Sequence, residues 1–337
     1  MNADRPDRPA TAPSRPRPLA SVSLDLDNLW AYLKTAGDSS WQQRPSYLDA
    51  FTPFMLEFLD RLGLRITFFI VGADAAIAAN GPALRSLVAA GHEVGNHSFE
   101  HEPWLNRYGP EQLRREVQSA GDAISDATGM RPAGFRGPGF SWSPALLELL
   151  ADLGYDYDAS TLPSFLGPLA RAYYFRTTRN LTAQEREQRK DLFGRFSDGL
   201  RPVKPYYWQL AGGRQLMEIP VTTVPVFKTP FHFSYLAYLS RFSERLMFAY
   251  LRTALGMCRL TGTEPSFLLH PLDVIGADKA PQLASFPGMD IPSARKADLL
   301  RRVLETIAAD FELVCMGRHA AEFARRGRFR SIANGQV

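Results

Sequence analysis

Short apolar runs alternate with amphipathic helical patterns along most of this chain, and that alternation limits what it can fold into. Repeated strand and helix units favour a parallel sheet, either open or closed into a barrel. The predicted strands are 21–27, 65–71, 92–96, 133–135, 216–221, 266–270 and 311–316. The predicted helices are 48–62, 83–90, 110–128, 144–153, 235–257 and 293–309. We therefore expect an α/β protein.

The alternation breaks between about 162 and 214, where polar and charged residues dominate. We expect this segment to be an insertion that projects from the scaffold as a lid or substrate-specificity element. Residues 1–19 are rich in proline and arginine, which predicts a disordered tail. A second tail is expected at 327–337. Residues 20–326 then form one domain, a size that a single α/β barrel reaches.

Composition excludes several classes of protein. The formal charge is +4 and the arginines are spread along the chain, so nucleic acid is not an expected partner. Cys258 and Cys315 are too few for a disulfide framework and fit a reducing compartment. Charged residues interrupt the best apolar window, 235–257, so no membrane-spanning helix is expected. The first twenty residues lack the apolar core of a secretory signal, which predicts a cytoplasmic location.

Two carboxylates, Asp25 and Asp27, stand at the end of the first predicted strand. The two-residue period of a strand places both on one face. The C-terminal ends of strands are where α/β barrels carry their active sites. Taken alone, such a pair more often consists of one helix cap and one solvated carboxylate.

His97 and His101 are four residues apart in a chain that has six histidines. On one helical turn, both imidazoles would project from the same side and could bind one divalent ion. The alternative is a pair of surface histidines without a ligand. His92, at the start of a predicted strand, is expected to be structural.

Two further segments carry polar residues next to short strands. Arg136 could form an ion pair with a buried carboxylate, and the backbone N–H near Gly139 could face an oxyanion. His270 ends an apolar strand, where it could protonate a leaving amine near neutral pH. Each feature alone is compatible with an ordinary turn or a structural histidine.

The order of these motifs, from a carboxylate pair through HxxxH and RxPxG to an apolar strand ending in Leu-His, resembles the NodB-homology or polysaccharide deacetylase family over about 19–323. The DxD form of the first motif is similar to that of the formamido-arabinose-lipid deformylases. The resemblance implies a distorted (β/α) barrel of the NodB-homology type, with the polar insertion and a metal site at the strand C-termini.

The resemblance also implies a metal site. It makes Asp27, His97 and His101 the ligands and Asp25 the general base, although the two aspartates could exchange roles. A site of two histidines and one carboxylate accepts Zn²⁺, Co²⁺, Ni²⁺ or Fe²⁺, with Zn²⁺ as the default.

The remaining roles also come from the resemblance. Arg136 would hold Asp25 ionised, and the Gly139 N–H would stabilise the oxyanion. The family commonly has an aromatic residue where Gly139 stands, so the aromatic wall is in question here. His270 would protonate the departing amine, and Asp158 would orient His270, with Asp156 as a competitor.

The expected activity is metal-dependent removal of an acetyl or formyl group from an amino sugar. The segment 224–255 interleaves aromatic residues with Lys228, Arg241, Arg245 and Arg252, which is suited to an anionic membrane surface. A lipid-linked or nucleotide-linked amino sugar, deacylated at the inner face of the membrane, is therefore expected. The alternative for this segment is an amphipathic helix packed on the barrel.

Two other functions remain open. One is a soluble deacylase or amidohydrolase of a small metabolite. The other is a catalytically inactive, carbohydrate-binding relative, which has no chemical need for the complete set of predicted residues.

Overall fold

The structure is a computed structural model that describes residues 17–177, 187, 190, 194–327 and 330–333. The predicted N-terminal tail therefore lies almost wholly outside the described residues. The strands are β1 Leu19–Leu26, β2 Thr67–Ile70, β3 Glu93–Asn96, β4 Gly134–Phe135, β5 Tyr157–Asp158, β6 Tyr206–Gln209, β7 Gln215–Glu218, β8 Ser266–Leu269, β9 Glu312–Val314 and β10 Ser331–Ala333. The helices are α1 Leu29–Ala36, α2 Leu48–Arg61, α3 Gly72–Ala75, α4 Gly81–Ala89, α5 Pro110–Thr128, α6 Pro144–Asp152, α7 Gly167–Thr177, α9 Phe233–Ser240, α10 Glu244–Thr261, α11 Ser293–Asp310 and α12 Met316–Arg326.

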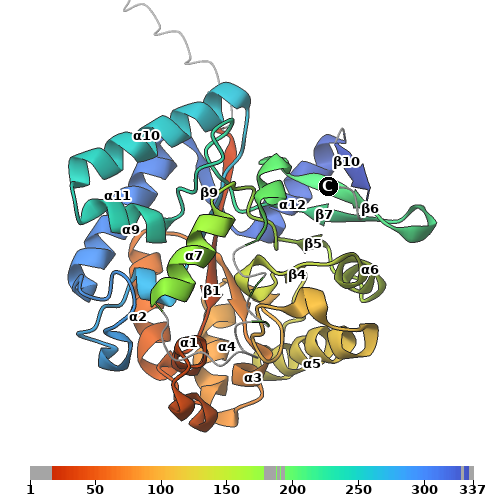
Figure 1. The fold of residues 1–337 in the computed structure, drawn as a ribbon, viewed down its shortest axis with the longest axis horizontal. Helices are drawn as coiled ribbons and strands as arrows, with labels where there is room; N and C mark the ends of the chain where they lie inside the picture. The colour runs from red at the N-terminus through yellow and green to blue at the C-terminus, as the bar shows by residue number, and fades with distance from the viewer. Residues whose placement is uncertain (1–16, 178–186, 188–189, 191–193, 328–329, 334–337) are drawn as a thin grey trace, which may run out of the picture.

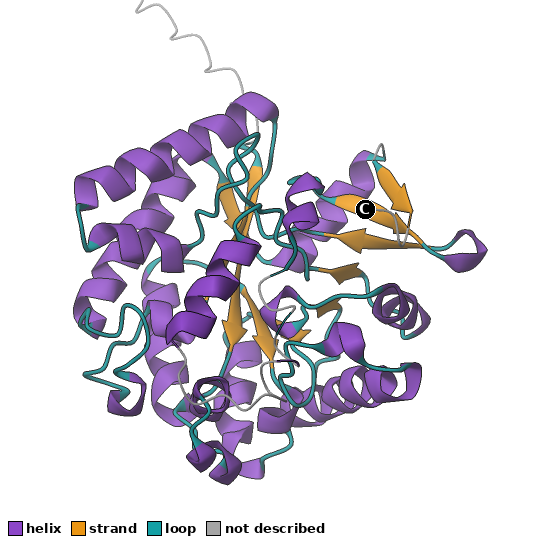
Figure 2. Cartoon of the chain, in the orientation of Figure 1, coloured by secondary structure: helices purple, strands orange, loops and turns teal. Residues whose placement is uncertain are grey.

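The strands form one sheet in the order β10-β6-β7-β5-β4-β3-β2-β1-β8, with β9 also paired to β1. The recorded pairings are parallel except for β6 with β7. Beyond β7, the Thr222 N–H donates to the Ser266 carbonyl of β8, which brings the two ends of the strand series together. Helices surround the strands in Figures 1 and 2. The predicted distorted (β/α) barrel is thus confirmed.

Strand β1 lies at the centre of the molecule, with all eight residues buried. Its apolar residues, from Ala20 to Leu26, belong to the main hydrophobic core beneath the helices. The alternate residues Ser21, Ser23 and Asp25 carry polar groups that contact His319 and Arg136. The two-residue period therefore separates a packing face from a polar face, and Asp25 is the last residue of the polar face.

The predicted helix 235–257 is wrong in one respect, because it is two helices. α9 ends at Ser240, and α10 begins at Glu244. The reason is local: the Ser243 hydroxyl accepts the N–H of Leu246, and a serine in this role starts a new helix.

Two segments outside the predicted alternation contribute to the sheet. β6 lies inside the expected insertion 162–214, and β10 lies inside the expected C-terminal tail 327–337. The two strands pair with each other from Tyr207–Ser331 to Gln209–Ala333. The polar insertion thus returns to the scaffold before residue 214.

Candidate active site

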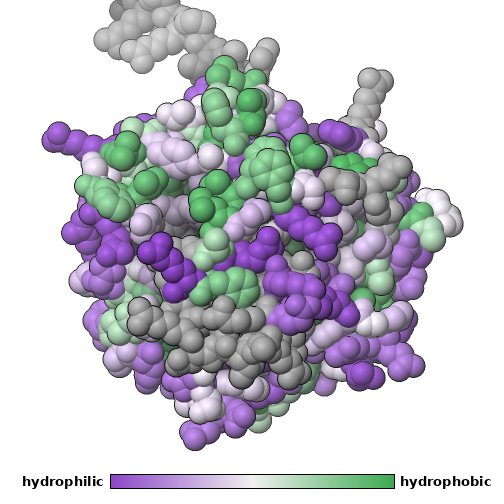
Figure 3. All heavy atoms as spheres, in the orientation of Figure 1, coloured by the Kyte–Doolittle hydropathy of each residue, from purple (hydrophilic) through white to green (hydrophobic). Residues whose placement is uncertain are grey.

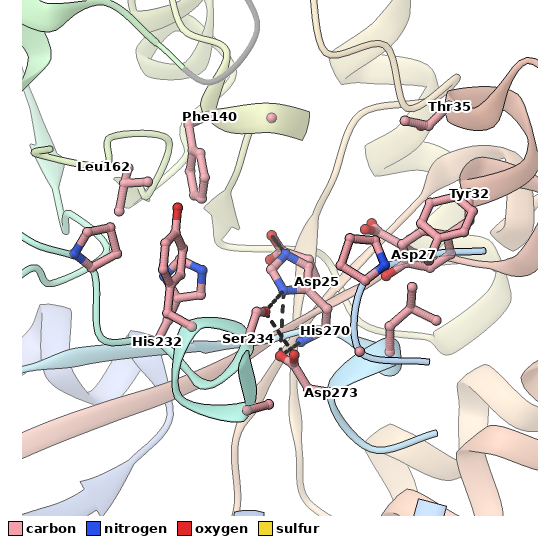
Figure 4. A pocket seen from close by; sticks show the side chains of 18 of the residues that line it. Asp25, Asp27, Tyr32, Thr35, Phe140, Leu162, His232, Ser234, His270 and Asp273 are labelled. Carbon is pink, nitrogen blue, oxygen red and sulfur yellow. Dashed lines mark hydrogen bonds and ion pairs between the residues drawn. The ribbon is translucent and has the colours of Figure 1, made fainter. Parts of the chain in front are cut away.

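A cavity of about 410 Å³ opens at the C-terminal ends of the strands. Figure 4 shows the side chains that line it, which come from segments far apart in the sequence. The lining includes six of the predicted residues: Asp25, Asp27, His97, His101, Gly139 and His270. The other two, Arg136 and Asp158, are fully buried.

Asp25 is held by Arg136, the residue that follows β4. The Arg136 Nη1 atom donates to Asp25 Oδ1 at 2.7 Å and to the Ser23 hydroxyl at 2.9 Å. The guanidinium also stacks on the Phe69 ring at 4.3 Å. A buried arginine needs such partners, because an unpaired charge in the interior is strongly unfavourable. One carboxylate oxygen of Asp25 is therefore fixed, while Oδ2 faces His97 and His270, at 3.9 Å from the Nε2 atom of each.

Asp27 lies beside both predicted histidine ligands. Asp27 Oδ1 is 2.9 Å from His101 Nε2 and 3.4 Å from His97 Nε2. The three ligand atoms lie within 4.8 Å of one another. The Nδ1 atom of His97 donates to the Arg136 carbonyl at 2.7 Å, which leaves Nε2 as a lone-pair donor. Apart from these two imidazoles, the buried Asp27 Oδ1 has no hydrogen-bond partner in the described part of the chain. These residues fit a divalent metal ion of the zinc type.

His101 reaches this position from a loop, so the prediction that both histidines share a helical turn is wrong. The chain after β3 has a positive φ at Ser98 (59°) and at His101 (52°). The Glu116 carboxylate of α5 accepts the N–H groups of Phe99 and Glu100, both at 2.9 Å. Backbone turns anchored from outside the loop therefore bring the two imidazoles together.

The electrostatics of the cluster favour opposite charges on its members. Burial alone would raise the pKa of Asp27, but His101 and His97 hold it well below its usual value. Burial would lower the pKa of His97, and the charges of Asp25 and Asp27 raise it instead. A carboxylate that is ionised at neutral pH is the form that binds a metal ion.

His270 follows β8 and points into the same cavity (Figure 4). Its Nδ1 atom is 3.7 Å from Asp273 Oδ2 and 3.5 Å from the Ser234 hydroxyl, which donates to Asp273 Oδ1 at 2.8 Å. Asp273 also accepts the backbone N–H of His270 at 2.8 Å. Burial would lower the pKa of His270, but Asp273, followed by Asp25 and Asp27, raises it to about 9.

The residue that orients His270 is thus Asp273, and the prediction of Asp158 for this role is wrong. Asp158 Oδ1 accepts the Ser160 hydroxyl at 2.5 Å, and the Ser160 oxygen accepts the Gly137 N–H at 2.8 Å. Burial, and then the Asp158 charge, raise the pKa of the adjacent Glu218 well above its usual value. Asp158 therefore supports the loop that begins at Gly137.

We expect Asp273→Asn to lower the pKa of His270, because it removes the largest contribution that raises it. An acid catalyst must be protonated, so activity should fall as pH rises through this pKa. The fall should begin about one pH unit lower in the variant than in the wild type. A bound cation would lower the pKa of His270 in both proteins, so the difference between the two pKa values would remain. The measurement is kcat against pH, with the exposed Asp298→Asn as control. An alkaline limb at the same pH in both proteins would contradict the assignment.

The loop after β4 places Gly139 and Phe140 on the cavity wall. Both have a left-handed backbone, with φ of 60° and 61°. Glycine adopts this conformation without strain, whereas phenylalanine does so at a cost. Gly137 is also required, since a Cβ atom there would lie 2.0 Å from the Ser141 carbonyl oxygen. Phe140 supplies the aromatic wall whose presence the sequence left in question (Figure 4).

The comparisons with known proteins agree with this geometry. Residues 38–157 match the sequence profile of the family described as polysaccharide deacetylase. The match covers about a third of the chain, and over these residues the chain is similar to polysaccharide deacetylases. The matched range includes His97 and His101, while Asp25 and Asp27 precede it.

Curated deacetylases are similar over part of the chain. The chitooligosaccharide deacetylase of Bradyrhizobium sp. (strain ANU 289) is 37% identical over 105 residues, which are 31% of this chain and 46% of that protein. The peptidoglycan deacetylase of Helicobacter pylori is 30% identical over 124 residues, 37% of this chain and 40% of that protein. The chain thus spans less than half the length of these relatives.

A solved structure extends the likeness to the whole fold. A candidate polysaccharide deacetylase from Mycobacterium smegmatis aligns with a TM-score of 0.59 and 19% identity, over 99% of both chains. This likeness shows that the two chains share one fold.

The cavity also has walls that the sequence analysis did not predict. His232, Ser234 and Tyr235 line it from α9 and the residue before that helix, and Tyr32 lines it from α1. Burial, and then the neighbouring His270, lower the pKa of His232 to about 4, so this imidazole is neutral at pH 7. The sequence feature that could have indicated these residues is the cluster of aromatic and polar residues in 231–235. This cluster resembles an ordinary helix start, so it does not stand out in the sequence.

Proposed function

We propose that this chain is a divalent-metal-dependent hydrolase that removes an N-acyl group, acetyl or formyl, from an amino sugar. The observation that carries the proposal is the position of Asp25. Its free oxygen, Oδ2, faces the Asp27, His97 and His101 cluster on one side and His270 on the other. A base and an acid on either side of one reaction centre are what hydrolysis of an amide needs.

The proposed roles follow from these positions. Asp27, His97 and His101 hold the ion, which when bound activates water and polarises the amide carbonyl. Asp25 accepts the proton of the attacking water through Oδ2, because Oδ1 is occupied by Arg136.

The other roles concern the charges that develop on the substrate. The Gly139 N–H lies on the cavity wall, where it would face the carbonyl oxygen. The raised pKa of His270 favours its protonated form, which would donate a proton to the departing amine.

Metal content tests this proposal first. The purified chain should contain about one transition-metal ion, and chelation should abolish hydrolysis of N-acetyl and N-formyl amino sugars. Metal without hydrolysis across such a panel would favour the inactive carbohydrate-binding relative. Hydrolysis of small N-acyl metabolites in preference to sugars would favour the soluble amidohydrolase.

For the substrate, we propose an amino sugar carried on a lipid or a nucleotide, deacylated on the cytoplasmic side of the membrane. The related deacetylases are named for chitooligosaccharide and peptidoglycan, which supports the amino sugar. Apolar and aromatic residues from the segment before α7, from the loop before α9 and from α9 itself line the cavity, which supports a lipid carrier: Leu162, Leu166, Pro230, Tyr235 and Tyr238. The unpaired Cys258 and Cys315 are compatible with a reducing compartment.

The surface around α9 and α10 supports membrane association. No helix in the described part of the chain is long and apolar enough to cross a bilayer. However, Phe242 and Leu246 are exposed, at 71% and 55%, beside the exposed Arg245 and Arg252. Figure 3 shows hydrophobic residues gathered in the upper half of this face, over α10. Exposed apolar and basic side chains together are typical of an anionic membrane interface.

We expect the double variant Phe242→Ser, Leu246→Ser to bind anionic liposomes at least about 10-fold more weakly than the wild type, since both side chains lose burial in the lipid. Co-sedimentation at low salt measures this. Met130→Ser, which alters an exposed apolar residue outside α9 and α10, is the control. Absence of binding by the wild type would remove the membrane part of the proposal.

A further inference from the structure

A second cavity, of about 300 Å³, adjoins the first. The two share three lining residues, Pro103, Gly139 and Phe140. The far wall of the second cavity comes from Gly194 to Arg201, inside the segment that the sequence marked as an insertion. A substrate group that extends past Phe140 would therefore enter this second cavity.

We infer that the second cavity is a subsite for a negatively charged group of the substrate, a phosphate or a carboxylate. The inference rests on the proposed function, because the charged group belongs to the amino sugar that is deacylated. Arg201 is the first observation. It lines the cavity with 4% of its surface exposed, and its Nη1 atom has no hydrogen-bond partner within the described residues.

The Arg201 side chain is held rigidly. Its guanidinium stacks on Trp142 at 4.1 Å and lies 5.2 Å from Trp208, and the two indole rings are stacked with centroids 5.0 Å apart. Its Nε atom is 3.3 Å from Asp198 Oδ1. A planar guanidinium fixed in this way is prepared to bind an oxyanion through its remaining N–H groups.

The second, independent observation is the start of α6. Ser143 and Pro144, the N-cap and first residue of this nine-residue helix, line the same cavity. The positive end of the helix dipole therefore faces the space that Arg201 lines, and the first turn has no acidic residue to oppose it.

The remaining charges in the cavity leave a positive balance. Arg195 also lines it, and Asp198 is the single acidic residue among the lining residues. The Asp198 carboxylate is already engaged by Arg201 and by the backbone N–H of Arg195 at 2.6 Å. An added anion would meet Arg201 and a helix N-terminus, while the Asp198 carboxylate is already engaged.

The position of this subsite agrees with the chemistry of carrier-linked amino sugars. In a 2-amino sugar attached to a nucleotide or a lipid carrier, a phosphate occupies the anomeric carbon, next to the carbon that bears the amide. A carboxylate on a neighbouring acidic sugar would lie at a comparable distance. Both are oxyanions within about one sugar ring of the bond that is cleaved.

The test compares substrates that differ in this group only: a neutral methyl glycoside, the 1-phosphate, the nucleotide diphosphate sugar, and a disaccharide with a neighbouring uronic acid. Arg201→Met should reduce the ratio of kcat/KM for the charged substrate over the neutral one by roughly 10- to 100-fold, the effect of one charge-assisted hydrogen bond. A reduced ratio for the phosphate substrates identifies a phosphate as the anion that the subsite binds. A reduced ratio for the uronic acid substrate alone identifies a carboxylate. An unchanged ratio for every charged substrate overturns the subsite.

Arg201→Lys keeps the charge and loses the planar fork, so it should give an intermediate ratio. This variant separates the effect of the charge from the effect of losing the Trp142 stacking. Arg61→Gln, an exposed arginine on α2, is the matched control and should leave the ratio as in the wild type.

Binding of inorganic pyrophosphate separates this inference from the proposed function. The titration uses the full chain with Asp27→Ala, so that a metal ion cannot bind the anion. Saturable binding that Arg201→Met weakens supports the subsite even if no substrate is hydrolysed. Absence of pyrophosphate binding, or equal binding with and without Arg201→Met, overturns the subsite.

Discussion

Replacing Asp27 with alanine is expected to remove the metal ion and the hydrolase activity together. Among the described residues, Asp27 supplies the carboxylate oxygen that lies beside both His97 and His101, and that oxygen has no further hydrogen-bond partner there. Substitution of a residue that only orients a metal ligand commonly weakens metal binding 10- to 100-fold, so loss of a ligand should weaken it by more than about 100-fold. Elemental analysis and isothermal titration with Zn²⁺ measure the effect.

The matched control is Asp126→Ala, which removes an exposed carboxylate from α5. It should keep both the metal and the activity. If Asp27→Ala retains the metal and Asp25→Ala loses it, then the two aspartates have exchanged the roles assigned to them.

The Asp25→Asn variant should show the opposite combination, with the metal retained and activity lost. An asparagine can still accept the Arg136 hydrogen bond through its oxygen but cannot take a proton from water. General-base catalysis contributes roughly 10²- to 10⁴-fold, so kcat should fall within that range. The comparison of kcat with metal content distinguishes this variant from Asp27→Ala.

The same substitution should also reduce stability. Arg136 is fully buried, and Asp25 is the carboxylate that pairs with it. Loss of one partner of a buried ion pair costs about 3 kcal/mol or more. Urea unfolding of Asp25→Asn and Asp126→Asn, followed by circular dichroism, gives this difference. Full activity in Asp25→Asn would exclude Asp25 as the base.

The sequence predicted best those residues whose role depends on the strand that precedes them. Asp25 and His270 stand at strand ends, and the parallel barrel brings strand ends together. Asp273 could not be found in this way, because its relation to His270 depends on the turn after β8 and on Ser234 from α9. Asp158 was predicted from a motif, and a sequence motif does not indicate that its partners in the fold are Ser160 and Glu218.

For the fold, the periodic segments were predicted well and the irregular ones were not. The predicted helix 110–128 agrees with α5 at both ends, because Pro110 opens it and Gly129 closes it with a φ of 75°. The short strands β6 and β10 depend on pairing with each other across more than a hundred residues of chain. Propensity within a short window carries no signal for such pairing.

Part of the wall of each cavity comes from later segments of the chain than the residues proposed to bind the metal. Asp27, His97 and His101 stand on the first half of the barrel, whereas residues 162–166, 194–201 and 230–238 build the outer walls. Substitutions in these later segments can therefore alter which molecule is accepted while the chemistry is preserved. Related chains could diverge in substrate by exchanging these segments alone, so overall similarity is a poor guide to substrate in such proteins.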